Sequence, residues 1–165
     1  MFEKLSLAGA ELLKMTLPDL LGGRIQAVQQ NDAEAVYSPN IQREDERIDW
    51  TRSSWEIYNQ VRGLNPFPVA FTLWNGEVLK IWSCANPRQE GSATRSRQAD
   101  RQGKVPGTVL QVKEYGIEVL TGDGTLWITE LQPSGRKAMS VDVFVRGGQM
   151  SENTVLGLEV TASEI

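Results

Sequence analysis

The sequence predicts a mainly β protein with flanking helices. Five short apolar runs lie between residues 69 and 132, and most are separated by glycines at turn positions. The dipeptide Asn75-Gly76 joins the first two runs, and it suits the two positive φ angles of a tight hairpin turn. One long polar insertion interrupts the series, and there are too few strands for a β-sandwich. These observations predict a small OB-like five-stranded antiparallel Greek-key barrel, preceded by a helix and an extended linker.

The first expected element is a helix within residues 1–23. Its leucines fall mostly on one stripe, and Gly22-Gly23 occupies the position after a helix end that glycine favours. Residues 24–46 are polar and weakly periodic, which indicates an extended linker. The domain proper is then expected over residues 47–165. An apolar helix stripe seeks cover, so we expect this helix either to pack on a domain or to dimerise through the stripe.

A second helix is predicted after Ser53, because Ser53-x-x-Glu56 is a capping box. Pro66 and Pro68 end it, since proline lacks an amide hydrogen and biases the preceding residue to extended backbone. We interpret "LNPFP" as a corner between helix and barrel rather than the rim of a catalytic site.

The strands are expected to follow at 69–74, 77–85, 108–115, 116–122 and 124–132. Gly122-Asp123-Gly124 lacks the following helix and the spacing of a phosphate loop, so we interpret it as a hairpin turn. Ser140 is positioned to cap a short helix over residues 141–146. Trp82 and Trp127 are expected in the core, and Trp74 is expected to be exposed.

The composition restricts the chemistry. The chain has no histidine, so neither a Ser-His-Asp triad nor a usual zinc site can be assembled from it. The single cysteine, Cys84, excludes an internal disulfide and favours a reducing cytoplasm. No apolar run is long enough to span a bilayer. Asp45, Glu46 and Asp49 are interpreted as part of a solvated linker rather than a metal site.

Positive charge is concentrated in one part of the chain. Residues 79–148 carry 10 basic and 7 acidic side chains, whereas the whole chain has a net charge of −4. The loop between Ser83 and Val105 alone holds five basic residues, namely Arg88, Arg95, Arg97, Arg101 and Lys104. Guanidinium groups match phosphate oxygens, so this segment is the expected contact for a polyanion such as nucleic acid.

Several longer stretches resemble one enzyme family. "IDWTRSSWEIYNQVRGLNPFPVAF", "PGTVLQV" and "GIEVLTGDGTLWITELQPSGRKAMSVDVFVRG" resemble the C-terminal half of methionyl-tRNA formyltransferases. The stretch "LQPSGRKAMS" is the most specific. Upstream, residues 1–23 are similar to the last helix of that family's catalytic domain, and the following polar segment is similar to its interdomain linker. One departure is Phe67, where the family usually has tryptophan.

The resemblance implies a division of labour. In that family an N-terminal domain binds 10-formyltetrahydrofolate and transfers the formyl group to the amino group of initiator Met-tRNA. Its asparagine, histidine and aspartate have no counterpart here, so we expect a C-terminal fragment that binds tRNA and is inactive alone, with no catalytic, cofactor or metal residues of its own. The expected tRNA contacts are Arg95, Arg97, Arg101, Lys104, Arg136 and Lys137, with Arg43 and Arg62 as weaker candidates. The alternative is a barrel that orients the catalytic domain of a related sugar-nucleotide formyltransferase.

Overall fold

The computed structural model describes residues 2–89, 103–148 and 150–159. The chain forms two compact units, Met1–Asn40 and Ile41–Ile165, and each is described by itself. Among the described residues, no helix combines the length and apolarity needed to cross a membrane.

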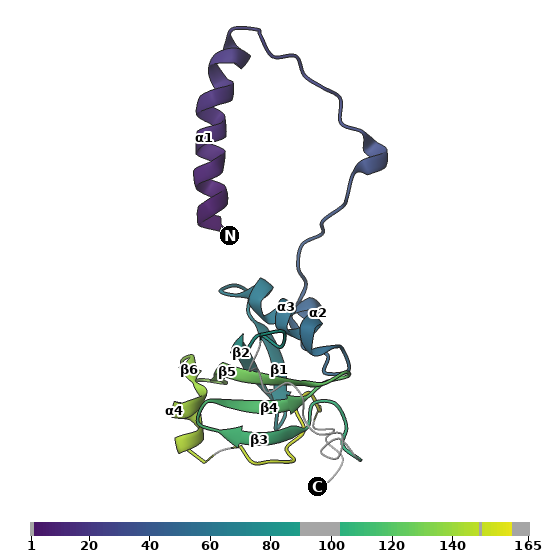
Figure 1. Ribbon diagram of the computed structural model, residues 1–165, viewed down its shortest axis with the longest axis vertical. Coiled ribbons are helices and arrows are strands. Elements are labelled where there is room, and N and C mark those ends of the chain that lie inside the picture. The colour runs from purple at the N-terminus through teal and green to yellow at the C-terminus, as the bar shows by residue number, and fades with distance from the viewer. Residues whose placement is uncertain (1, 90–102, 149, 160–165) are drawn as a thin grey trace. The chain divides into compact units, whose positions relative to one another are not determined.

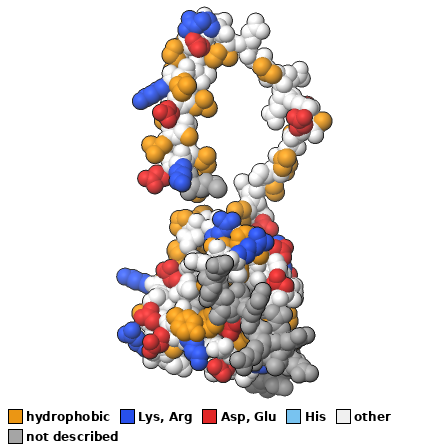
Figure 2. All heavy atoms as spheres, viewed as in Figure 1, with side chains coloured by type: hydrophobic (Ala, Val, Ile, Leu, Met, Phe, Trp, Pro, Cys, Tyr) orange, Lys and Arg blue, Asp and Glu red, His pale blue; other side chains and the backbone are white. Residues whose placement is uncertain are grey.

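The first unit is mainly one helix, α1 (Phe2–Leu21), followed by a 3₁₀ turn, η1 (Asp32–Glu34). Helix α1 ends as predicted, because Gly23 adopts a positive φ of 67° and the Gly22 amide donates to the Pro18 carbonyl at 3.0 Å. None of its residues is buried, and hydrophobic side chains lie along its exposed surface (Figure 2).

The second unit is an antiparallel sheet with flanking helices (Figure 1). Its strands are β1 (Ala70–Trp74), β2 (Glu77–Cys84), β3 (Val109–Lys113), β4 (Gly116–Leu120), β5 (Thr125–Pro133) and β6 (Met139–Ser140). The order is β1-β2-β5-β4-β3, and β6 pairs with the far part of β5. The predicted number of five strands was therefore one short. The two-residue strand β6 is too brief to show an alternating pattern.

The sheet is open, and the C-terminal segment 150–159 bonds to both of its edges. On the β3 edge, the Val109 amide donates to the Thr154 carbonyl at 2.8 Å. On the β1 edge, the Gly157 amide donates to the Leu73 carbonyl at 2.8 Å. One short segment thus satisfies backbone groups that two edge strands would otherwise leave unpaired.

Of the three helices described in this unit, two follow the sequence pattern and one departs from it. Helix α3 (Ser54–Leu64) begins at Ser53 with the predicted reciprocal capping box, and α4 (Val141–Arg146) begins after Ser140. The Ser140 hydroxyl, however, donates to Asp142 and does not cap the backbone. Helix α2 (Arg43–Glu46) lies in a stretch that was predicted to be an extended linker. It forms because Gln42 and Asp45 cap its first turn reciprocally.

The core lies between the sheet and the helices. Helix α3 contributes Ile57, Val61 and Leu64, while α4 contributes Val141 and Phe144. Figure 1 shows α2 and α3 together near β1 and β2, and α4 on the side of β3 and β6. This arrangement fixes one face of α3 in the core and leaves its other face toward solvent.

Gly122-Asp123-Gly124 forms the predicted hairpin turn, between β4 and β5, and it also contacts the start of α3. The Asp123 carboxylate accepts a hydrogen bond from the Ser54 amide at 2.7 Å, and the Gly122 amide donates to the Arg52 carbonyl at 2.9 Å. A carboxylate at a helix N-terminus satisfies an orphan amide and complements the helix dipole. The turn therefore sets the position of α3 on the sheet.

We expect Glu56→Gln to remove part of the acid sensitivity of folding. Hydrogen bonds from the Ser53 hydroxyl and amide, helped by Arg52, lower the pKa of Glu56 from 4.5 to about 2. Its charged form is favoured by the fold, so its contribution is present above pH 4.5 and is lost as the pH falls toward 2. Urea denaturation at several pH values should show wild type more stable at pH 6, with the difference shrinking toward pH 2. A difference independent of pH would contradict this assignment.

Candidate nucleic-acid interface

Three of the predicted tRNA contacts, Arg95, Arg97 and Arg101, lie outside the described residues. The other loop residue, Lys104, is exposed shortly before β3. Two further candidates, Arg136 and Lys137, are exposed in the turn between β5 and β6. The two weaker candidates lie on helices, Arg43 on α2 and Arg62 on α3. The described candidates are thus spread over four segments.

The arginines of the second unit divide into those with and those without a carboxylate partner. Four form ion pairs: Arg43 with Glu46, Arg47 with Glu159, Arg52 with Glu56, and Arg146 with Asp142. Within the described residues of this unit, Arg62, Arg88 and Arg136 form no ion pair. A guanidinium without a carboxylate keeps its charge available for an incoming anion.

Arg43 is the predicted residue that the structure engages most closely. It pairs with Glu46 in the same helix, and its guanidinium lies 3.9 Å from the centroid of the Phe71 ring. The ring contact holds α2 against β1, whereas the ion pair lies within α2 itself. A phosphate would have to compete with Glu46 for this side chain.

The exposed side of α3 carries two stacked aromatic rings with an arginine at each end, and we term this set the α3 row: Arg88, Trp55, Tyr58 and Arg62. The Arg88 guanidinium lies 3.7 Å from the Trp55 centroid, and the Trp55 and Tyr58 rings stack with centroids 5.6 Å apart and planes at 25°. At the other end, the Arg62 guanidinium lies 5.8 Å from the Tyr58 centroid. The row presents two charges, neither paired with a described carboxylate, on an aromatic support.

Helical spacing and one turn assemble the α3 row. Trp55, Tyr58 and Arg62 follow each other by three and four residues, which places them on one side of a helix. Arg88 comes from the segment after β2, where the Asn86 side-chain oxygen accepts from the Arg88 amide at 3.0 Å. Such a turn fixes the direction of the chain at Arg88.

The guanidinium groups at the ends of the row retain hydrogen-bonding capacity. The Nε of Arg62 donates to Asn59 Oδ1 at 2.7 Å, and no partner is found for its terminal nitrogens in the part of the chain that is described. The Arg88 side chain makes no hydrogen bond to any described residue. Both can therefore offer paired N–H donors to an anion.

A cavity of about 230 Å³ adjoins the Arg62 end of the row. Its lining residues are Tyr58, Val61, Arg62, Asn65, Trp82, Ser83 and Cys84. Burial raises the pKa of the Cys84 thiol, so this group is neutral and is a poor nucleophile. The lining supplies hydrogen-bonding groups and the aromatic rings of Tyr58 and Trp82.

Hydrogen bonds connect this cavity to the β5–β6 turn. The side-chain Nδ2 of Asn65 donates to the Trp82 carbonyl at 2.7 Å, and the Trp82 ring nitrogen donates to Gln132 Oε1 at 3.0 Å. Gln132 in turn donates to the Arg136 carbonyl at 2.8 Å. Trp82 is half-buried rather than fully in the core, and the chain of bonds links α3 to the turn that carries Arg136 and Lys137.

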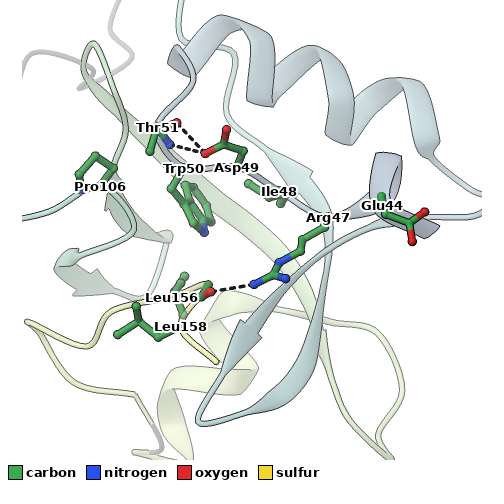
Figure 3. A pocket seen from close by; sticks show the side chains of 10 residues that line it. Glu44, Arg47, Ile48, Asp49, Trp50, Thr51, Pro106, Leu156 and Leu158 are labelled. Atoms are coloured by element: carbon green, nitrogen blue, oxygen red, sulfur yellow. Dashed lines mark hydrogen bonds between the residues drawn. The ribbon is translucent and has the colours of Figure 1, made fainter. Parts of the chain in front are cut away.

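A larger hollow of about 410 Å³ lies beside the C-terminal segment (Figure 3). It is lined by Glu44, Arg47, Ile48, Asp49, Trp50, Thr51, Pro106, Leu156, Gly157 and Leu158. Its cation, Arg47, donates to the Gly157 carbonyl at 3.1 Å and pairs with Glu159 at 2.8 Å. Asp49 accepts from the Thr51 amide and hydroxyl. These groups hold the C-terminal segment and the start of the domain, and the lining residues include no unpaired arginine.

The sequence pattern did not single out the aromatic part of the α3 row. Tyr58 packs partly on the core, and Trp55 is half-buried beneath Arg88. The spacing Trp55-x-x-Tyr58-x-x-x-Arg62 was the available signal. The prediction for Trp74 was wrong, because this ring is half-buried against Phe144, with centroids 5.6 Å apart.

The sequence matches a known class of domain. A family profile described as "Formyl transferase, C-terminal domain" matches residues 40–149, and the chain belongs to that family. More particularly, the chain is 46% identical over 156 residues to methionyl-tRNA formyltransferase of Bacillus velezensis and 45% identical over 157 residues to that of Bacillus subtilis. Each match covers 94% of this chain and 46% of the relative, so the chain spans about half the length of these relatives. The predicted resemblance is confirmed.

The fold is also similar to a solved structure. A variant of HypX from Aquifex aeolicus matches with a TM-score of 0.56 at 17% sequence identity, over 94% of this chain and 26% of that one. At this identity the match shows a likeness of fold.

Proposed function

We propose that this chain is the tRNA-binding part of a methionyl-tRNA formyltransferase, and that it binds and positions tRNA without catalysing the reaction. The observation that carries the proposal is the set of exposed arginines without described carboxylate partners, Arg62, Arg88 and Arg136. Hydrogen bonds through Trp82 and Gln132 connect the end of α3 to the turn that carries Arg136. In Figure 2, blue Lys and Arg side chains lie beside orange hydrophobic ones in the region of α2 and α3. The relatives of the chain act, by name, on methionyl-tRNA.

The chemistry of this surface suits the sugar–phosphate backbone of RNA. Guanidinium groups bind phosphate oxygens through two parallel N–H donors, and contacts of this kind orient a nucleic acid without reading its sequence. Lys104, Arg136 and Lys137 are exposed charges on other segments of the domain, and Arg95, Arg97 and Arg101 remain proposed contacts from the same loop as Lys104. Because the net charge is −4, such binding would depend on where charges lie and not on their sum.

The proposed role is not catalytic because the chain lacks the groups for it. It has no histidine, and its one thiol is held neutral by burial. In the complete enzyme, a domain upstream would bind 10-formyltetrahydrofolate and transfer the formyl group to the amino group of initiator Met-tRNA in the cytoplasm. We propose that residues 1–23 belong to that domain, that 24–46 are the interdomain linker, and that 47–165 are the tRNA-binding domain.

An OB-like barrel is part of the proposal. The sheet itself is open, but the C-terminal segment bonds to β3 and to β1, and this supports closure through the segment. Barrels of the OB type commonly bind oligonucleotides on the sheet face and adjoining loops.

Titration of the chain with initiator tRNA transcript at several salt concentrations tests the proposal. We expect the logarithm of the association constant to fall linearly with the logarithm of salt, with a slope of about −3 or steeper if three or more phosphates are neutralised. Absence of salt-sensitive binding at about 50 mM salt, together with tight binding to the separately expressed upstream half of a relative, would contradict it. That result would favour the orienting barrel of a sugar-nucleotide formyltransferase.

A further inference from the structure

We propose that Trp55 and Tyr58 act as positioning residues that hold Arg88 and Arg62 as a pair of preoriented phosphate receptors for the tRNA backbone. This inference rests on the proposed function and assigns it to a particular surface, the α3 row. It differs from a general attraction of tRNA to basic residues because it requires the aromatic rings as well as the charges.

The first argument is the geometry of Arg88. Its guanidinium lies 3.7 Å from the centroid of the Trp55 ring, which is close to van der Waals contact. A guanidinium that lies over a ring still has its N–H donors around its edge, where a phosphate can accept two of them. An exposed arginine without such support loses more side-chain freedom when it binds an anion.

The second argument is that the support itself is fixed. Trp55 stacks on Tyr58, and Tyr58 packs against the core alongside Ile57 and Val61 of the same helix. The capping box at Ser53 and the Asp123 carboxylate fix the first turn of α3. The rings are thus held in place by the core and by the start of the helix. They in turn restrict the positions of the Arg88 and Arg62 guanidinium groups.

The third argument is the contrast with the other stacked arginine. Arg43 also lies over a ring, but Glu46 neutralises it. Arg88 and Arg62 have no carboxylate partner among the residues that the structure describes. A carboxylate would complete an internal structural contact, so stacking without one indicates that the partner anion comes from outside.

The experiment measures tRNA affinity and its salt dependence for a small set of variants of the full chain. Arg88→Gln removes a charge and should reduce the steepness of the salt slope by about 0.9. Trp55→Leu keeps every charge, so the slope should not change, while the affinity should fall about two- to fivefold through the lost stacking. Trp55→Phe should keep most of the wild-type affinity, because phenylalanine still offers a ring for stacking.

Two comparisons separate positioning from charge alone. In an Arg88→Gln background, Trp55→Leu should cause little further loss, because the ring has no guanidinium left to orient. Lys113→Gln removes one exposed charge from the end of β3 and serves as the matched charge control. Circular dichroism and thermal unfolding would establish that each variant is folded.

Several outcomes would overturn the inference while leaving the proposed function intact. If wild type binds tRNA with a steep salt slope but Arg88→Gln and Lys113→Gln have the same effect, the α3 row has no special role. If the losses of tRNA binding free energy caused by Trp55→Leu and Arg88→Gln are fully additive in the double variant, the ring does not position the arginine. If row variants leave tRNA affinity unchanged but weaken association with the upstream half of a relative, the row is a domain contact. Failure of wild type to bind tRNA would refute the proposed function itself.

Discussion

Replacing Gly122 by alanine is expected to destabilise the second unit by about 3 kcal/mol, the upper range for steric overpacking of a tightly packed site. A Cβ at this position would lie 1.9 Å from the Thr51 carbonyl oxygen and 3.1 Å from that of Arg52. Both obstacles are backbone atoms, so no side-chain rotation can relieve the overlap. The turn would have to move away from α3 and lose the Asp123 contact to the Ser54 amide.

Gly63 offers a matched control for this substitution. It lies in the exposed part of α3, and a Cβ there meets no atom within 4 Å. Gly63→Ala should therefore stabilise the protein by about 0.5–1 kcal/mol through helix propensity. Urea denaturation of both variants measures the difference. Equal effects from the two substitutions would show that the contact between the turn and α3 is not tight in solution.

Local signals predicted most of the secondary structure, because those signals depend on neighbours in the chain. Ser53 and Glu56 cap α3, and Asn75-Gly76 has the two positive φ angles of the predicted turn, 53° and 79°. Strand β6 and helix α2 escaped prediction because each is too short to carry a periodic pattern. The role of segment 150–159 also escaped, since its partners Val109 and Leu73 are distant in sequence.

The candidate site was predictable in its charge and not in its geometry. Sequence composition located positive charge after residue 79, and family resemblance added tRNA as the partner. Which arginines are neutralised depends on contacts that composition cannot show: Arg43 has Glu46 beside it, whereas Arg88 meets Trp55 from a different element. Pairing of a cation with a ring across two elements is a property of the tertiary fold.

Replacing Trp50 by alanine should have a still larger effect on stability, about 3–5 kcal/mol, as is typical for loss of a buried large side chain. Trp50 is only 4% exposed. A Cβ added to Gly107 or to Gly157 would contact its ring at 3.3 Å, so both glycines pass close to it. The Trp50 ring, which belongs to the segment before α3, therefore packs against both the residues that precede β3 and the C-terminal segment. In Trp50→Ala, the Gly157 amide, which donates to the Leu73 carbonyl, should exchange its hydrogen faster than in wild type.

A double-mutant cycle with Thr72 isolates the polar part of this effect. The Trp50 ring nitrogen donates to the Thr72 hydroxyl at 3.0 Å, and both groups are buried. Thr72→Val alone should cost about 1–3 kcal/mol because it leaves a buried donor unsatisfied. In a Trp50→Phe background the same change should cost much less, since no donor remains to be satisfied. An equal cost of Thr72→Val in both backgrounds would mean that packing alone, and not this hydrogen bond, joins Trp50 to β1.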